Sequence, residues 1–123
     1  MFRVIEFAFV GYPITDVARA RAFYEGVLNF TPASNWDHEG LAWIEYEVGP
    51  YVLAISNMAS DKWKPSPDGP CVALEVENFD TAIEHLKAKG VSFRLEPMAS
   101  PVCRMAVVSD PDGNAITIHK RNS

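Results

Sequence analysis

Residues 107–120 read VVSDPDGNAITIHK, and this stretch decides how the rest of the chain is interpreted. Two apolar runs flank the segment DPDGN at residues 110–114. Proline sets the backbone angle of one turn position, glycine accepts a positive φ, and aspartate and asparagine bond to the nearby backbone. The stretch therefore predicts a β-hairpin with a longer loop, which closes the second of two similar halves of the chain.

The composition is that of a globular domain. The chain has 123 residues, of which 48% are apolar and 22% charged, and this is enough for one domain with a buried core. The net charge of −5, without a cluster of Lys and Arg, argues against binding to nucleic acid. No apolar run is long enough to span a membrane, and two cysteines without metal-binding spacing predict free thiols in a cytoplasmic protein.

The first half of the chain is predicted to contain one helix among four strands. Residues 4–12 are apolar and rich in β-branched and aromatic side chains, which predicts a strand buried on both faces over much of its length. Asp16 is placed to cap a helix, and Asn29 is placed to end it in the left-handed conformation. The other three strands are predicted at residues 30–37, 41–48 and 51–56.

The second half repeats this order of elements. A strand at residues 71–76 precedes Asn78, which is placed to cap a helix that ends at Gly90. Three more strands are predicted at residues 91–96, 102–109 and 114–119. The two helix caps, Asp16 and Asn78, lie 62 residues apart (78 − 16), which is about half of the chain.

The spacing therefore predicts a duplication within one domain, 1–123. Each half would be one βαβββ module, and neither module alone could cover its own sheet, so the two are expected to fold together. Module one is expected at about 1–58, the connection at 59–69 and module two at about 70–120. The predicted fold class is α+β, with curved mixed sheets around a cavity and the helices outside.

Two segments carry a resemblance to a known family. The sequence ITDVARARAFYEGVLNF at residues 14–30 and the DPDGN hairpin resemble the vicinal-oxygen-chelate superfamily. That superfamily includes glyoxalase I, extradiol dioxygenases, fosfomycin-resistance enzymes and bleomycin-resistance proteins. The resemblance covers nearly the whole chain and implies a homodimer. It indicates a fold more strongly than a reaction, because many functions are built on one fold.

The resemblance also implies four metal-ligand positions, on the first and the last strand of each module. Counting back from the helix caps places the first-strand positions at Phe9 and Cys71, and the positions on the last strands are Ala54 and Thr117. The family usually has His, Gln or Glu there. A benzyl ring and a methyl group cannot coordinate, and one Cys with one Thr cannot make a tight four-ligand site. We therefore predict that the metal site has been lost and that no cofactor is bound.

Strand alternation and the neighbouring aromatic and basic residues predict a ligand pocket. Its candidate residues are Phe9, Trp43, Ala54, Cys71, Glu75, Arg104, Thr117 and His119. Burial would raise the pKa of Glu75 and make it a general base, and Arg104 would clamp a carboxylate or phosphate. The alternatives are a solvated Glu75, a surface His119, an Arg104 that reaches solvent or pairs with Glu96, and side chains that only pack the sheet.

Three functions are compatible with this sequence. The first is a metal-free small-molecule-binding protein similar to the bleomycin-resistance type, with an aromatic groove and acidic residues such as Glu45, Glu47 or Glu75. The second is a glyoxalase-like metal-dependent lyase or isomerase, which the four substituted positions argue against. The third is a metal-independent enzyme that uses Glu75, His119 or Arg104. We favour the first, with a small molecule and a second copy of the chain as partners, and without nucleic acid or membrane.

Overall fold

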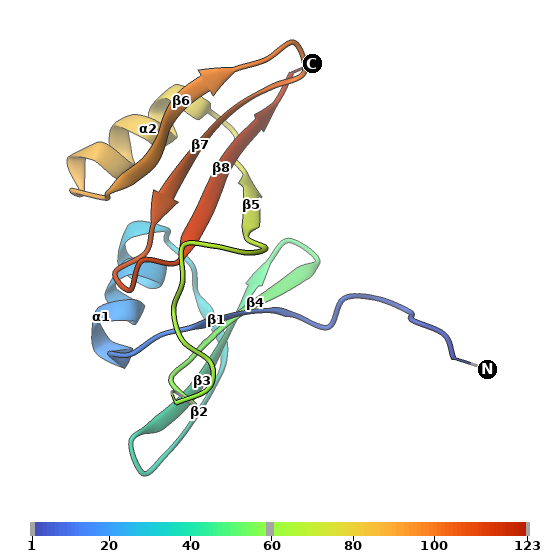
Figure 1. The fold of residues 1–123 in the computed structure, drawn as a ribbon, viewed down its shortest axis with the longest axis vertical. Helices are drawn as coiled ribbons and strands as arrows, with labels where there is room; N and C mark the ends of the chain where they lie inside the picture. The colour runs from blue at the N-terminus through green and yellow to red at the C-terminus, as the bar shows by residue number, and fades with distance from the viewer. Residues whose placement is uncertain (1, 59–60, 123) are drawn as a thin grey trace. The chain divides into compact units, whose positions relative to one another are not determined.

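The computed structural model describes residues 2–58 and 61–122, and these form two compact units, Met1–Lys64 and Pro65–Ser123 (Figure 1). Each unit holds one four-stranded mixed sheet with helical segments. We refer to the units as module one and module two. The predicted connection at 59–69 includes residues 59 and 60, which lie outside the described residues.

In its described residues, module one contains one sheet, one α-helix and one π-helical turn. Its elements are β1 (Val10–Pro13), α1 (Val17–Arg21), η1 (Ala22–Val27), β2 (Pro32–His38), β3 (Leu41–Val48) and β4 (Tyr51–Ser56). The strand order is β1-β4-β3-β2, with β1 parallel to β4 and the other pairs antiparallel. Along β3, Ala42, Ile44 and Tyr46 are buried and alternate with residues that are not, as expected for a strand with one face toward the core.

The helical segment of module one begins and ends where predicted. A carboxylate oxygen of Asp16 accepts a hydrogen bond from the backbone N–H of Arg19 at 3.0 Å. Asn29 has a φ of 62°, the left-handed conformation expected after a helix. The segment differs from a continuous α-helix in its second part, where the N–H of Leu28 donates to the carbonyl of Phe23, an i→i−5 bond of 3.0 Å.

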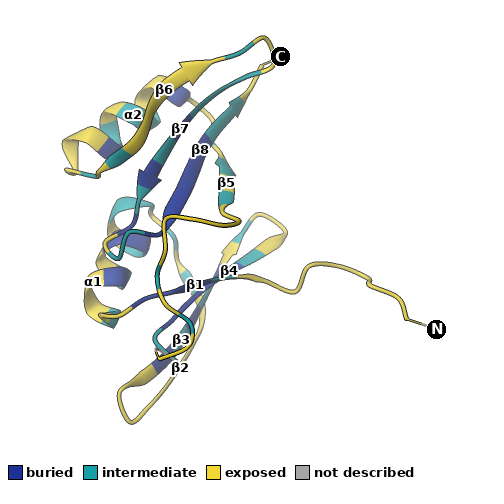
Figure 2. Cartoon of the chain, in the orientation of Figure 1, coloured by how far each residue is buried: buried dark blue, intermediate teal, exposed yellow. Residues whose placement is uncertain are grey.

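The start of the chain differs from the prediction. β1 begins only at Val10, and residues 2–9, which we call the N-terminal arm, lie outside the sheet and are exposed (Figure 2). The predicted buried strand over residues 4–12 is therefore wrong for most of its length. The parallel register explains this, because Val10 lies opposite Leu53 and β4 begins at Tyr51. Most of the arm therefore lies beyond the first residue of β4, where no described strand is available to pair with it.

Module two repeats the topology of module one. Its elements are β5 (Val72–Glu75), α2 (Phe79–Ala88), β6 (Phe93–Ala99), β7 (Cys103–Ser109) and β8 (Ala115–Arg121). The strand order β5-β8-β7-β6 corresponds position by position to the order in module one. Asn78 caps α2 through a 3.0 Å bond from the N–H of Thr81, and Gly90 follows the helix with a φ of 75°. The α+β class and the repeated modules are confirmed.

The DPDGN segment forms the predicted hairpin loop between β7 and β8. One carboxylate oxygen of Asp110 accepts hydrogen bonds from the backbone N–H groups of Asp112 and Asn114, both at 2.9 Å. The other oxygen accepts from the side-chain amide of Asn114, also at 2.9 Å. Gly113 has a φ of 89°, which a residue with a Cβ rarely adopts. The amide oxygen of Asn114 accepts from the N–H of Ser66 at 3.1 Å and so ties the incoming chain to the loop.

Candidate ligand-binding faces

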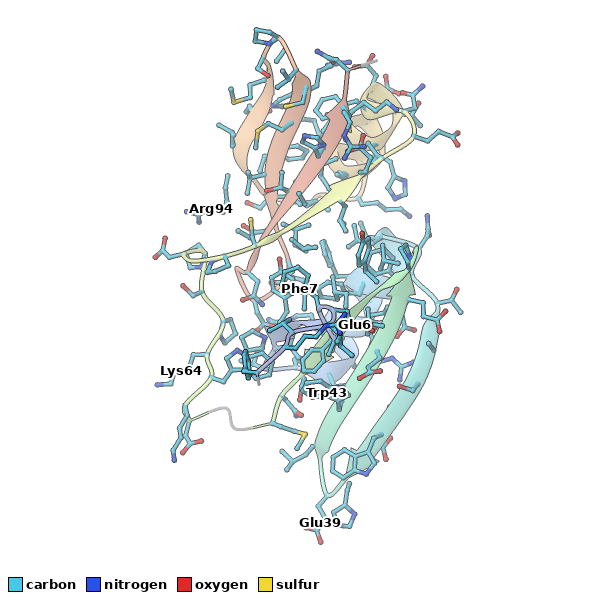
Figure 3. All side chains as sticks on the ribbon, turned by 90° about the vertical axis from the view of Figure 1, so that its right-hand side faces the viewer. Glu6, Phe7, Glu39, Trp43, Lys64 and Arg94 are labelled. Carbon is cyan, nitrogen blue, oxygen red and sulfur yellow. The ribbon has the colours of Figure 1, made fainter. Side chains whose placement is uncertain are left out.

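The sheet of module one carries aromatic rings and a carboxylate on the face opposite its helical segment. The ring of Phe9 meets the ring of Trp43 edge to face, with centroids 5.1 Å apart. The indole N–H of Trp43 donates to Glu45 at 2.8 Å, and the hydroxyl of Ser34 lies 3.5 Å from the other oxygen of that carboxylate. Neither Trp43 nor Glu45 is fully buried, and Figure 3 labels Trp43 on this sheet. We call Phe9, Trp43 and Glu45 the aromatic face.

A glycine and an alanine leave room beside these rings. Gly11 and Glu45 are both register partners of Ala54, so all three residues lie on the same side of the sheet. A Cβ atom added to Gly11 would lie only 3.2 Å from the indole ring of Trp63. The absence of a side chain at Gly11 therefore lets Trp63 lie against β1, next to the aromatic face.

Four predicted residues of module two come together on one side of its sheet. Glu75 and His119 are register partners on β5 and β8, and Ala73 and Thr117 are the pair before them. The thiol of Cys71 lies 3.4 Å from the hydroxyl of Thr117. Nδ1 of His119 lies 2.6 Å from a carboxylate oxygen of Glu75. We call Cys71, Glu75, Thr117 and His119 the polar face.

The environment of Glu75 reverses the predicted pKa shift. Its second carboxylate oxygen accepts a hydrogen bond from the backbone N–H of Arg121 at 2.7 Å. That bond, followed by the bond to His119, lowers the pKa of Glu75 below its ordinary value, and burial opposes this only weakly. The raised pKa is wrong and the alternative of a solvated Glu75 is right, because Glu75 is exposed and accepts hydrogen bonds from two donors. Glu75 is therefore an ionised acceptor rather than a general base near neutral pH.

Arg104 lies on the other side of the sheet of module two. Its guanidinium group donates to Asp80 on α2 at 2.8 Å and lies 4.5 Å from the ring centre of Phe79. The ion pair lowers the pKa of Asp80. Arg104 therefore faces the helix and does not share the polar face. Its alternative pairing with Glu96 is also wrong, since Glu96 pairs with Lys87 at 2.9 Å.

The four positions implied for a metal do not supply a metal site. Phe9 and Ala54 have no donor atom, and Cys71 and Thr117 provide one thiol and one hydroxyl. Within residues 2–58 and 61–122, no three His, Cys, Asp or Glu side chains are grouped closely enough to hold a metal ion. The donor set present does not fit a catalytic divalent metal, which needs about three protein ligands.

Two contributors to these faces were not predicted from the sequence. Ser34 on β2 holds Glu45, and Met105 on β7 is the register partner of His119. The alternation within each strand is visible in the sequence, but the residue opposite on a neighbouring strand is not. Ser34 lies opposite Glu45 because β2 and β3 pair regularly from His38 and Leu41 at the hairpin end, and the register shifts only between Pro32 and Ser34.

The sequence model of the Glyoxalase/Bleomycin resistance protein/Dioxygenase superfamily matches residues 6–118 of this chain. That match covers nearly the whole chain and includes both modules. No curated protein matches the chain in sequence. None of the helices that the structure describes is long and apolar enough to cross a membrane.

Solved structures share the fold at low sequence identity. TnmS3, an antibiotic binding protein from Streptomyces sp. CB03234, is 21% identical, with a TM-score of 0.82 over 99% of this chain and 100% of that chain. A glyoxalase/bleomycin resistance protein from the same organism is 23% identical, with a TM-score of 0.75 over 92% and 98%. A superfamily member from Sphaerobacter thermophilus DSM 20745 is 22% identical, with a TM-score of 0.75 over 94% and 98%. With two βαβββ modules and a family match over residues 6–118, this chain belongs to the Glyoxalase/Bleomycin resistance protein/Dioxygenase superfamily.

Proposed function

We propose that this chain is a small-molecule-binding member of the superfamily that works without a metal ion. The observation that carries the proposal is the aromatic face, where the ring of Trp43 and the carboxylate of Glu45 lie side by side and are only partly buried. The lack of donor atoms at Phe9 and Ala54 supports a metal-free function. The similar fold of TnmS3, described as an antibiotic binding protein, supports a small organic molecule as the ligand.

The chemistry of the aromatic face favours a flat ligand with a positive charge. Aromatic rings stack on flat apolar molecules, and ring faces also attract cations. Glu45 already accepts hydrogen bonds from Trp43 and Ser34, which hold its carboxylate in place. A fixed carboxylate beside aromatic rings favours a cationic ligand over an anionic one of the same shape.

Two fluorescent tricyclic probes of opposite charge test this proposal. Proflavine is a flat cation, and 9-anthracenecarboxylate is a flat anion of similar size. We expect proflavine to bind more tightly than the anion, and Trp43→Ala to weaken proflavine binding by roughly tenfold, or about 1.4 kcal/mol. Glu45→Gln should weaken the binding of proflavine by a similar factor and leave the anion unaffected. Fluorescence anisotropy titrations measure all of these affinities.

Glu84→Gln is the matched control, because it removes the same charge from the exposed side of α2. A thermal-shift series with Zn, Ni, Mn, Fe and Co tests the metal-dependent alternative. A metal at 100 times its dissociation constant would stabilise the protein by about 2.7 kcal/mol, and we expect no such shift. Equal affinity of both probes for the wild type and for both site variants would contradict the proposal.

We also propose that the protein is a cytoplasmic homodimer. The N-terminal arm supports the dimer, because Phe2, Val4, Ile5 and Phe7 are all strongly exposed and the last of them is 87% exposed. Apolar surface of this kind marks contacts with another chain, and within the described part of the chain no strand lies beside the backbone of residues 2–9. The free thiols of Cys71 and Cys103 support a reducing compartment.

Introducing an aspartate into the N-terminal arm should therefore dissociate the dimer. We expect Phe7→Asp and Ile5→Asp each to weaken dimerisation by roughly 30-fold or more, as for buried interface anchors. Light scattering coupled to size exclusion measures the mass as a function of concentration. Tyr51→Asp is the control, because Tyr51 is also exposed (67%) but lies outside the arm. A wild-type protein that remains monomeric at every concentration would contradict this part of the proposal.

A further inference from the structure

The pair of Glu75 and His119 on the polar face has a fixed geometry. The two residues are register partners on parallel neighbouring strands, and their side chains meet at 2.6 Å. The second oxygen of Glu75 is held by the N–H of Arg121 at 2.7 Å. Both carboxylate oxygens therefore have a donor, and the imidazole ring of His119 is oriented by one of them.

This arrangement determines which nitrogen of His119 carries the hydrogen. Hydrogen bonds from Arg121 and His119 lower the pKa of Glu75, so its carboxylate is ionised and only accepts hydrogen bonds. Nδ1 must then be the donor in the neutral ring, and Nε2 is left with a lone pair. The side chain of His119 makes no second hydrogen bond within residues 2–58 and 61–122, and it is 26% exposed. Nε2 is thus available to an incoming molecule.

The surroundings of His119 provide a surface for a small ligand. Thr117 lies two residues earlier on β8 and faces the same way, about 7 Å along the strand. The hydroxyl of Thr117 contacts the thiol of Cys71, and Met105 lies opposite His119 on β7. A base, a hydroxyl, a thiol and an apolar thioether therefore lie on one side of one sheet.

We propose that His119 is a general base oriented by Glu75, and that the polar face accepts a small molecule with an acidic C–H bond. In the step, the C–H bond breaks, a new N–H bond forms at Nε2, and the electron pair stays on the ligand. The resulting imidazolium ion is paired with the carboxylate of Glu75, and its proton later returns to the product or to water. The step requires no metal and no redox partner. It goes beyond ligand binding, because it is a reaction carried by residues of module two alone.

The base-induced ring opening of 5-nitrobenzisoxazole tests this activity directly. Removal of its C3 proton forms a nitrile, breaks the N–O bond and releases 2-cyano-4-nitrophenolate, which absorbs visible light. We expect His119→Gln to slow the protein-dependent rate by roughly 100-fold and Glu75→Gln by about tenfold.

His38 provides the matched control for this experiment. It also lies near a glutamate, with Nε2 3.7 Å from Glu39, but both side chains are strongly exposed at the tip of the β2–β3 hairpin, where Figure 3 labels Glu39. We expect His38→Gln to retain the wild-type rate. In addition, ¹⁵N NMR should show the Nδ1–H form of His119 in the wild type and its loss in Glu75→Gln, whether or not a probe binds.

Two results would overturn the proposal. One is a wild-type rate equal to that of His119→Gln, and the other is a His119 ring with its hydrogen on Nε2 in the wild type. Binding of proflavine at the aromatic face tests the proposed binding function separately. Binding without proton abstraction would therefore remove this inference and leave the binding function in place.

Discussion

Replacing Tyr24 with alanine is expected to destabilise the protein by about 3–5 kcal/mol, the usual cost of deleting a buried aromatic ring. Tyr24 lies in η1, is fully buried and contacts four other rings. Its ring stacks on Tyr46 with centroids 6.1 Å apart and meets Phe23 edge to face at 5.1 Å. A domain of this size has a free energy of unfolding of only about 5–15 kcal/mol. The substitution would therefore remove a large part of the free energy of unfolding.

Urea unfolding followed by circular dichroism measures this change. Tyr24→Leu should cost less than Tyr24→Ala, because leucine fills part of the space and occupies the corresponding position, Leu86, in module two. Tyr51→Ala is the control, since its ring is exposed and its loss should change stability by no more than about 0.5 kcal/mol. If Tyr24→Ala and Tyr51→Ala unfold at the same urea concentration, the packing of the aromatic cluster has been misjudged.

The second large effect is expected at Asp110. Replacing it with alanine should lower the free energy of unfolding by roughly 3 kcal/mol or more, because each buried donor left unpaired costs about 1–3 kcal/mol. Asp110 is buried, and its carboxylate accepts from two backbone N–H groups and from the amide of Asn114. Asn114 is also buried and carries the bond to Ser66. Removal of the carboxylate therefore loosens both the hairpin loop and the chain that enters module two.

Asp110→Asn gives a sharper test of the same network. Its oxygen can still accept from the N–H groups of Asp112 and Asn114, but its NH₂ group would face the NH₂ group of Asn114. We therefore expect a smaller loss than for alanine, though still a measurable one. Asp68→Ala is the control, because it removes an exposed carboxylate from the same module. Equal urea midpoints for the Asp110 and Asp68 variants would rule out a structural role for the buried carboxylate.

Much of the candidate site could be predicted from residue spacing. Alternation along the predicted strands at residues 71–76 and 114–119 placed Cys71, Glu75, Thr117 and His119 on one side of a strand pair, and the structure brings them together. The side of the sheet on which Arg104 lies could not be predicted from spacing in the same way. Its neighbours Cys103 and Met105 gave no sign of which side of β7 faces α2, and the contact with Asp80 spans 24 residues of sequence.

The direction of the pKa shift of Glu75 could not be predicted from its neighbours in the sequence. A glutamate between apolar strand residues suggests burial, and burial raises a carboxyl pKa. The groups that decide the shift are a backbone N–H and an imidazole from β8, which are more than 40 residues away in the sequence. Only the pairing of β5 with β8 brings these two groups to Glu75, and together they lower its pKa.

The duplication, the two helix caps, the DPDGN hairpin and the family were determined by the sequence alone, because each depends on residue types at short or regular spacings. The exposed arm at residues 2–9 was decided by tertiary structure, since its apolar side chains would suit a strand but β4 is too short to pair with them. The direction of Arg104 and the charge state of Glu75 were decided in the same way. Local propensity specifies which elements form, whereas the length and register of the neighbouring strands specify which groups meet.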